Sequence, residues 1–225
     1  RDSTQAWSEM ISFFLQKLLD DGLEIRQSEK IKAQIEQCKL ETGGEFLKSK
    51  GRPKCSSELL TWYSQPVKNQ VAPQLVKGVA NHQSRSHLDT DLLRYLFASS
   101  VAKRSGVSPK LYDFQGFANY LMPKHRSART NKFSDRFRVQ LANSPATTIT
   151  SHISKDGHYF IHYDPLQCRS LTVREAARIQ TFPDNYLFRG SRTAQFHQIG
   201  NAVPPFLANQ IAEIVFNIVT GNSKS

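Results

Sequence analysis

The 225-residue sequence has no long apolar run, few cysteines and few acidic side chains. No hydrophobic segment approaches the roughly 18 residues that cross a bilayer, so we expect no membrane anchor. The three cysteines, Cys38, Cys55 and Cys168, are widely spaced. They fit reduced thiols in a cytoplasm better than a disulfide framework or a C-x-x-C zinc site. The chain opens with Arg1 rather than Met and nothing near it resembles a signal peptide, so we expect a piece of a longer protein.

Positive charge is abundant. Thirty Lys and Arg residues oppose nineteen Asp and Glu residues, which leaves a formal net charge of +11. A chain this basic is attracted to polyanions. Much of the surplus lies between residues 101 and 140, where nine basic residues alternate with aromatic ones and only two acids occur. Such a stretch is compatible with an ordinary solvated surface, but the interleaved aromatic side chains favour nucleic-acid binding.

Helical periodicity occurs in several parts of the chain. Apolar residues recur every three to four positions over 7–19, 89–106 and 205–218, and a shorter pattern covers 58–63. A polar pattern over 25–40 predicts an exposed helix. Gly106 follows one of these segments and Pro204 and Pro205 open another, as is typical of helix ends and helix starts.

An alternating pattern replaces the helical one after residue 135. The segments "RFRVQ" (136–140), "TTITSHI" (147–153) and "HYFIHY" (158–163) are rich in β-branched and aromatic residues, and "KDG" (155–157) is a hairpin-turn sequence. These features predict a small antiparallel sheet. The expected fold class is therefore α+β, with a helical N-terminal part, this sheet, and helices at the C-terminus.

Two local motifs follow the predicted sheet. Thr172 precedes Glu175 by three residues, which predicts a capping box at the start of a helix that ends before Pro183. Further along, "GNAVPP" (200–205) predicts a tight turn in which Gly200 permits close backbone approach. Turn chemistry alone makes this a simple connector. The exposed start of the following helix would also favour a negative group.

These motifs resemble those of a known enzyme family. "RSLTVREAARIQTFPDNYLFRGS" (169–191) and "QIGNAVPPFLANQIA" (198–212) look like the last two conserved blocks of the DNA cytosine-5 methyltransferases. "RVQLANSPATTITSHISKDGHYFIHYDP" resembles the segment that closes their target recognition region, and "VANHQSRSH" with "DTDLLRYLFASS" resembles more weakly the segment that opens it. The resemblance covers about residues 79–215. It identifies the chain as the C-terminal part of such an enzyme.

The resemblance implies roles for two groups of residues. In the family, the Gly-Asn-Ala-Val turn walls the S-adenosylmethionine pocket, so Asn201, Ala202 and Val203 are the expected cofactor neighbours. The Arg-x-x-Thr-x-Arg-Glu block braces the recognition domain against the catalytic domain. By this resemblance the structural residues are Arg169, Thr172, Arg174, Glu175 and Arg178, and none of them performs chemistry.

The residues that perform the family's chemistry are absent from this sequence. The family places its nucleophilic cysteine in a Pro-Cys dipeptide and a glutamate in Glu-Asn-Val, and neither occurs here. The resemblance therefore implies that the catalytic cysteine and most of the S-adenosylmethionine site lie outside this chain. The C-terminal helices would pack on a missing α/β methyltransferase domain, supplied by the same polypeptide or by a separate subunit. The fragment alone is expected to be inactive.

Double-stranded DNA is the expected partner, as in the DNA methylation of restriction-modification systems. Basic side chains in recognition regions hold phosphates and read base edges. The candidates are Lys124, Arg126, Arg129 and Lys132, with Arg85 and Lys155 as weaker ones. Arg136 and Arg138 alternate with apolar residues and are equally compatible with ordinary outward charges. We divide the chain into a helical segment of unknown role (1–75), the recognition region (76–166) and the C-terminal motifs with their closing helix (167–225).

Other functions are compatible with the sequence. The main alternative is a stand-alone DNA-binding or regulatory module without catalytic activity. A purely structural interaction protein is disfavoured by the localised positive charge. A metal site formed by His152, His158 and His162 is conceivable, but their spacing is unspecific and ordinary histidines are several times more common. We expect a cytoplasmic, nucleoid-associated protein that does not engage a membrane.

Overall fold

The computed structural model describes residues 4–20, 33, 57–64, 80–117, 121–123, 134–155 and 157–221. The chain forms two compact units that interleave along the sequence. Unit 1 comprises 1–50, 84–147 and 157–171, and unit 2 comprises 51–83, 148–156 and 172–225. The functional boundaries at residues 75 and 166 stay a prediction.

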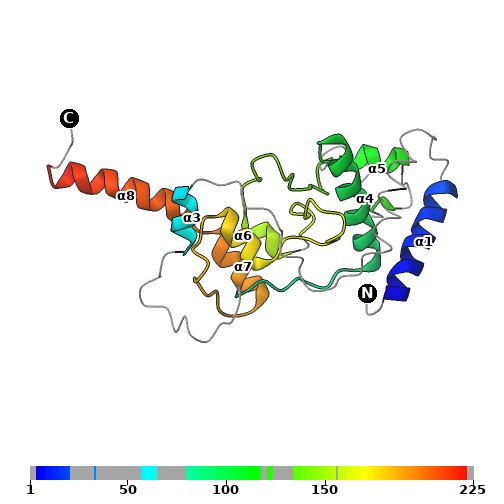
Figure 1. The fold of residues 1–225 in the computed structure, drawn as a ribbon, viewed down its shortest axis with the longest axis horizontal. Coiled ribbons are helices and arrows are strands. Elements are labelled where there is room, and N and C mark those ends of the chain that lie inside the picture. Colours follow the sequence, from blue (N-terminus) through cyan, green and yellow to red (C-terminus); the bar gives the residue numbers. More distant parts are fainter. Residues whose placement is uncertain are drawn as a thin grey trace. The chain divides into compact units, whose positions relative to one another are not determined.

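Helices make up the regular structure of the described residues (Figure 1). The elements are α1 (Thr4–Asp20), α3 (Ser57–Ser64), α4 (Asp89–Ser105), α5 (Leu111–Phe117), the 3₁₀-helix η4 (Ser151–Ser154), α6 (Val173–Ile179), α7 (Arg192–Gly200) and α8 (Pro205–Val219). The helices predicted at 7–19, 58–63, 89–106 and 205–218 are confirmed. So is the one that begins after Thr172. The polar helix predicted over 25–40 lies outside the described residues, apart from residue 33.

Unit 1 is built around α4. This helix ends as the sequence predicts, because Gly106 adopts the left-handed conformation (φ 73°) and donates its N–H to Ala102. The ring of Phe114 lies between those of Phe97 and Phe137, with centroids 5.0 and 5.2 Å away. These three side chains are buried and form the aromatic centre of the unit.

The predicted antiparallel sheet is wrong. Where the structure describes residues 134–171, it contains isolated bridges and no strand. Val139 bridges Ile161 in parallel orientation, and Ile161 bridges Ser170 in antiparallel orientation. The α+β fold class therefore does not hold for the described part of the chain, which is helical with irregular connections.

The predicted hairpin fails because its first arm makes local contacts instead. In η4 the Ile153 N–H donates to the Thr150 carbonyl at 3.1 Å, and the Ser154 hydroxyl donates to the Ser151 carbonyl at 2.7 Å. Thr147, at the start of this arm, donates its backbone N–H to the side chain of Gln140 at 3.0 Å. The two arms also belong to different units, 148–156 to unit 2 and 157–171 to unit 1.

Unit 2 ends in α8, which leads away from α6 and α7 in Figure 1. None of its residues is buried. By length and composition alone, the stretch Arg192–Val219 is apolar enough to cross a membrane. The chain turns at 201–204 within that stretch, however, and α8 itself has only 15 residues. At 1.5 Å per residue it would span about 22 Å, less than the roughly 30 Å hydrocarbon core of a bilayer.

Candidate functional site

The predicted capping box is present at the start of α6. The Thr172 hydroxyl accepts the backbone N–H of Glu175 at 3.2 Å, and the Glu175 carboxylate accepts the backbone N–H of Thr172 at 2.8 Å. The Nδ1 atom of His82 lies 2.9 Å from the same hydroxyl. The helix start is thus tied to the segment around residue 82.

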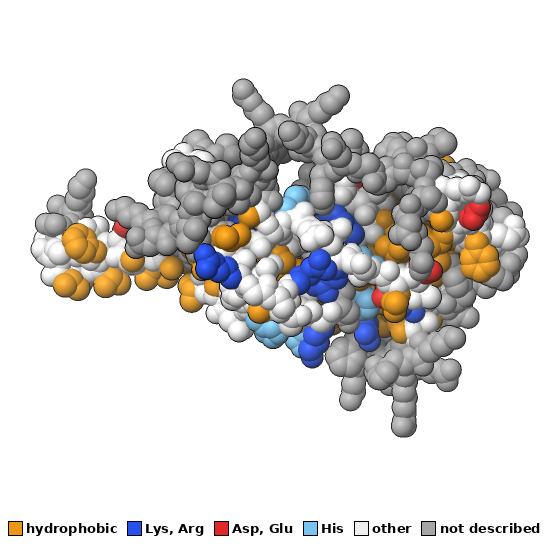
Figure 2. All heavy atoms as spheres, turned by 90° about the horizontal axis from the view of Figure 1, so that it is seen from below, with side chains coloured by type: hydrophobic (Ala, Val, Ile, Leu, Met, Phe, Trp, Pro, Cys, Tyr) orange, Lys and Arg blue, Asp and Glu red, His pale blue; other side chains and the backbone are white. Residues whose placement is uncertain are grey.

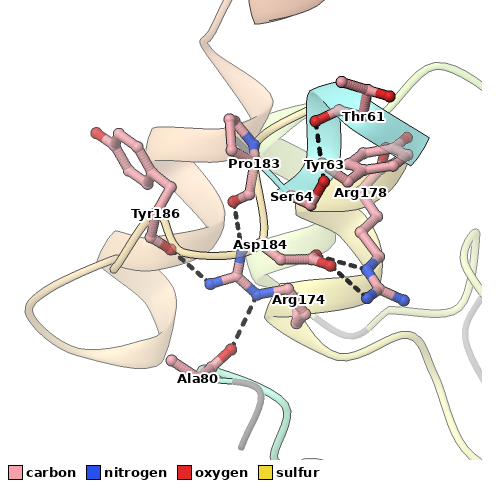
Figure 3. A network of polar contacts seen from close by, with 9 residues as sticks. All are labelled: Thr61, Tyr63, Ser64, Ala80, Arg174, Arg178, Pro183, Asp184 and Tyr186. Atoms are coloured by element: carbon pink, nitrogen blue, oxygen red, sulfur yellow. Dashed lines mark hydrogen bonds and ion pairs between the residues drawn. The ribbon is translucent and has the colours of Figure 1, made fainter. Parts of the chain in front are cut away.

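Arg174 is the largest fully buried side chain of the molecule's described part. Its guanidinium donates to three backbone carbonyls, those of Ala80 at 2.9 Å, Pro183 at 3.1 Å and Tyr186 at 2.5 Å (Figure 3). It also lies over the ring of Phe188, 5.7 Å from the centroid. Burial lowers the pKa of Arg174. The side chain therefore joins 80, 183 and 186 to α6.

Arg178, one turn further along α6, makes a different contact. Its guanidinium donates to both carboxylate oxygens of Asp184, at 2.7 and 2.6 Å (Figure 3). This hydrogen bonding raises the pKa of Arg178. Tyr63 of α3 donates its hydroxyl hydrogen to the Arg178 carbonyl at 2.8 Å and accepts the Asp184 N–H on its own carbonyl. The segment after α6 is therefore fastened to α3.

Arg169 lies in unit 1 and is buried. It donates to the Gln167 side chain at 3.1 Å and to the Ser170 carbonyl at 3.2 Å. The contacts of these arginines and of the capping box hold their own units together. Their role in bracing a recognition domain against a catalytic domain stays a prediction.

Asn81 is a site residue that the sequence analysis missed. It has a left-handed backbone conformation (φ 61°), and its side-chain amide exchanges two hydrogen bonds with the backbone of Phe188, both 3.1 Å long. Its carbonyl accepts the N–H of Arg174 at 3.0 Å. Asn tolerates this conformation better than most residues. That preference was the available sequence signal, but it does not identify Phe188 as the partner.

Gly200 fulfils the expectation of close backbone approach. A Cβ atom at this position would lie 2.3 Å from the backbone nitrogen of Ser151 and 2.5 Å from the carbonyl carbon of Thr150. The end of α7 therefore packs directly on the backbone at the start of η4. The residue type at position 200 is restricted to glycine because a side chain there would collide with the backbone of Thr150 and Ser151.

Gln180 was also missed. Its side chain is buried, and its Nε2 atom lies 3.2 Å from the Ile199 carbonyl and 3.4 Å from the Ile149 carbonyl. A third carbonyl, that of Ala202, is 3.5 Å away. The Gln180 side chain at the end of α6 is thus hydrogen-bonded to the end of α7 and to the turn that follows α7.

The three expected cofactor neighbours form this turn. Asn201 is exposed, and its backbone N–H donates to His197. The Asn201 side chain makes no polar contact within the described part of the chain. Val203 is 64% exposed. The amide of Asn201 and the apolar side chain of Val203 are therefore both accessible, and their contact with a cofactor stays a prediction.

The start of α8 is held by Thr181. This residue also has a left-handed backbone (φ 62°), and its hydroxyl accepts the N–H of Phe206 at 3.1 Å. Trp62 of α3 donates its indole N–H to the Thr181 carbonyl at 2.6 Å and packs edge-on against the Phe206 ring at 5.2 Å. Helix α3, which belongs to the segment of unknown role (1–75), therefore contacts the residues that hold the start of α8 next to the 201–203 turn.

The expected DNA-binding residues are only partly within the described structure. Lys124, Arg126, Arg129 and Lys132 lie outside the described residues. Arg85 is half-buried in unit 1, near Gly157. Lys155 is exposed at the end of η4. Their contact with DNA stays a prediction.

Two histidines of unit 1, His87 and His158, belong to a buried polar cluster. Tyr95 and His158 are joined through the hydroxyl and Nδ1 at 2.8 Å. His87 accepts the backbone N–H of Ser170 at 3.2 Å and packs edge-on against Tyr95. Burial, with a smaller contribution from the Arg85 charge, lowers the pKa of His87 to about 4. The cluster therefore contains a neutral His87 at neutral pH.

The conceivable metal site depended on the hairpin that does not form. His152 lies on η4, while His158 is bonded to Tyr95 and the Nδ1 of His162 accepts the N–H of Asp164 at 3.1 Å. Within the ranges that the structure describes, no group of three His, Cys, Asp or Glu residues could hold a metal ion. The sequence reasoning for that site is not supported by this geometry.

Comparison with known proteins finds relatives of this chain among the type II methyltransferases. It is 53% identical over 146 residues to the type II methyltransferase M.Bpa9945I of Bacillus paralicheniformis. This match covers 64% of this chain and 31% of that protein. It is 34% identical over 137 residues to the putative type II methyltransferase M.OihORF3336P of Oceanobacillus iheyensis, covering 60% of this chain and 29% of that one. The chain therefore spans about a third of the length of these relatives. No solved structure matches it.

A third relative differs in coverage. The type II methyltransferase M.AquIB of a Picosynechococcus species is 40% identical over 100 residues, and the match covers 40% of this chain but 68% of that protein. The family model for C-5 cytosine-specific DNA methylase matches residues 24–217, most of the chain. With its capping box, its Gly200 turn and this match, the chain belongs to the C-5 cytosine-specific DNA methylase family.

Proposed function

We propose that this chain is the DNA-binding and target-recognition portion of a DNA cytosine-5 methyltransferase. The complete enzyme transfers a methyl group from S-adenosylmethionine to C5 of cytosine, and its catalytic cysteine lies outside this chain. The observation that carries the proposal is the apolar surface of α8, which begins just after the Gly200 turn. A soluble enzyme would cover such a surface with its remaining part.

The exposed side chains of α8 define this surface. Figure 2 shows hydrophobic side chains along the exposed helix. Leu207, Ile211, Ile214 and Ile218 recur every three to four residues and are 48–67% exposed. Burying an apolar side chain of this size contributes about 1.5–3 kcal/mol, so a helix with four of them gains much from a partner. We assign that partner to the α/β methyltransferase domain, from the same polypeptide or from a separate subunit.

The coverage of the relatives supports both arrangements. Relatives such as M.Bpa9945I have about twice as much sequence outside the matched part as within it, which leaves room for a catalytic domain in one polypeptide. M.AquIB is matched over 68% of its length, which leaves little room for a catalytic domain in that polypeptide. We favour neither arrangement, because both place the nucleophile outside the described motifs.

The cofactor would meet this chain at Asn201, Ala202 and Val203. Their exposed turn is held by Gln180 and Thr181, so its position is set before any ligand binds. When bound, S-adenosylmethionine supplies the methyl group. The part of the enzyme beyond this chain would make most of the contacts with it. The basic residues Arg85 and Lys155, and those between 124 and 132, would hold double-stranded DNA in the cytoplasm, near the nucleoid.

A complementation assay tests the proposal. The 225-residue chain is mixed with the N-terminal two thirds of the relative M.Bpa9945I, and tritium transfer from labelled S-adenosylmethionine to duplex DNA is measured. We expect transfer by the mixture and none by either part alone. Transfer by the 225-residue chain alone, or DNA binding without any complementation, would favour the view that α8 is not built for a catalytic partner.

A matched pair of α8 variants sharpens the assay. Ile214→Lys puts a charge into the apolar stripe, whereas Asn217→Lys puts the same charge at an exposed polar position of the same helix. The proposal expects loss of complementation for Ile214→Lys and little change for Asn217→Lys. Equal activity of the two variants would show that the stripe is not the docking face.

A further inference from the structure

A polar cavity of about 550 Å³ opens in unit 2 between the segment before α4 and the start of α7. It is lined by Asn81, His82, Gln83, Val173, Arg192 and Gln195. Five of these six residues are polar and none is acidic. None of them is among the residues that the resemblance linked to DNA or to the cofactor, so the cavity has no role in the proposed function so far.

The charge in this cavity comes from Arg192. Its side chain is exposed, and within the part of the chain that the structure describes it has no ion pair and no hydrogen bond. Gln83 is likewise exposed and has no polar partner there. By contrast, Glu175, which does not line the cavity, forms the capping box with Thr172. An uncompensated guanidinium beside a free amide is suited to an anion with several acceptor oxygens.

The other lining groups are already fixed in place. Asn81 is bonded to the backbone of Phe188, His82 contacts Thr172, and Gln195 donates its side-chain amide to the Gly190 carbonyl at 3.0 Å. These contacts make the cavity wall rigid while Arg192 and Gln83 stay available. Helix α7 adds a smaller contribution through the positive end of its dipole, although its Ala194 N–H already donates to the Ser191 hydroxyl at 3.3 Å.

We propose that this cavity holds a phosphodiester group of the DNA backbone. Arg192 supplies the positive charge and Gln83 a neutral donor. The inference rests on the proposed DNA-binding function and adds a phosphate contact made by the C-terminal motifs, outside the basic stretch at 101–140. A phosphate held here positions the duplex and carries no base specificity.

Salt-dependent DNA binding tests the site. The dissociation constant of the 225-residue chain for a fluorescein-labelled 24-base-pair duplex is measured by anisotropy between 50 and 200 mM salt, for the wild type and for Arg192→Gln. The logarithm of the dissociation constant rises with the logarithm of the salt concentration, and loss of one phosphate contact makes this slope smaller by about 0.9. Between 50 and 200 mM salt, the affinity advantage of the wild type over the variant is therefore expected to shrink about 3.5-fold. Arg192→Lys, which keeps the charge, should retain the wild-type slope.

Two further variants serve as controls. Arg189→Gln removes an exposed arginine that precedes α7 but does not line the cavity, and it should leave affinity and slope within error of the wild type. Gln83→Glu changes the net charge of the cavity by the same amount as Arg192→Gln and should weaken binding to a similar extent. Circular dichroism confirms that each variant is folded.

The outcomes separate the two proposals. If the wild type binds DNA and Arg192→Gln binds with the same affinity and slope, the phosphate site is wrong and the proposed function stands. If the wild type does not bind the duplex at any salt concentration, both are wrong. If 10 mM inorganic phosphate protects Arg192 from phenylglyoxal but the duplex does not, the cavity binds free anions and the assignment to DNA is overturned.

Discussion

Gly200 lies so close to Ser151 that a Cβ atom on the glycine would come within 2.3 Å of the serine backbone nitrogen. The contact joins the last residue of α7 to the first residue of η4. The restricted sequence of the turn thus has a structural cause within this chain. The same contact sets where Asn201, Ala202 and Val203 emerge.

Replacing Gly200 by alanine is therefore expected to destabilise unit 2. The added methyl group meets backbone atoms, which cannot rotate away, so we expect a loss of about 3 kcal/mol. Gly106→Ala is the comparison, because Gly106 has a positive φ of 73° but nothing within 4 Å of a Cβ atom. That variant should lose only about 1 kcal/mol. Urea denaturation measures both, and equal losses would contradict the close contact.

Substitution of Arg174 tests the buried network. Lysine cannot reach the carbonyls of Ala80, Pro183 and Tyr186 with one ammonium group, so Arg174→Lys leaves buried acceptors unsatisfied and should cost about 2–4 kcal/mol. Arg178→Lys is the matched control. Its side chain is 50% exposed, and its pair with Asp184 should contribute less than about 1 kcal/mol. Thermal unfolding monitored by circular dichroism distinguishes the two variants.

His87 predicts a pH dependence of unit 1. Its pKa is about 4 in the folded protein and 6.5 in the unfolded chain, so between these values the unfolded state binds a proton that the folded state does not. The contribution of neutral His87 to the free energy of unfolding is fully present above pH 6.5 and is lost as the pH falls toward 4. The loss attributable to His87 is about 1–2 kcal/mol after allowance for solvent screening.

The measurement compares His87→Gln with the wild type at pH 7 and pH 5. Glutamine can accept the Ser170 N–H but does not titrate. Hydrogen exchange of the α4 amides should therefore depend less on pH in the variant than in the wild type. The exposed His152, replaced by glutamine, serves as the control and should leave the dependence unchanged. An identical pH dependence in all three proteins would disprove the assignment to His87.

Trp62 predicts that α3 supports the start of α8. Trp62→Phe retains an aromatic ring against Phe206 but removes the donor to the Thr181 carbonyl, which should cost about 1 kcal/mol. Hydrogen exchange at the Phe206 amide should accelerate. Tyr63→Phe removes a hydroxyl bonded to the Arg178 carbonyl at an exposed position and should leave the Phe206 amide unchanged. Faster exchange at Phe206 in both variants would mean that α3 acts only by general packing.

Local features of the sequence determined much of this protein. The helices at 89–106 and 205–218 follow from apolar spacing and from Gly106 and Pro205 at their ends, because the signals lie within one or two turns of the chain. The capping box of Thr172 and Glu175 is equally local. The family resemblance was also legible from two uninterrupted blocks, and the family match confirms it.

Tertiary structure decided the features that need a distant partner. Segments 136–140, 147–153 and 158–163 alternate like strands, but a strand needs a neighbour, and η4 satisfies its own backbone locally instead. Asn81 and Gln180 look like ordinary polar residues in sequence, and only the fold reveals which carbonyls they bind. Gly200 lies between these cases. Its need for close approach was readable from its residue type, whereas its partner, 49 positions earlier in the chain, became evident only when α7 packed on η4.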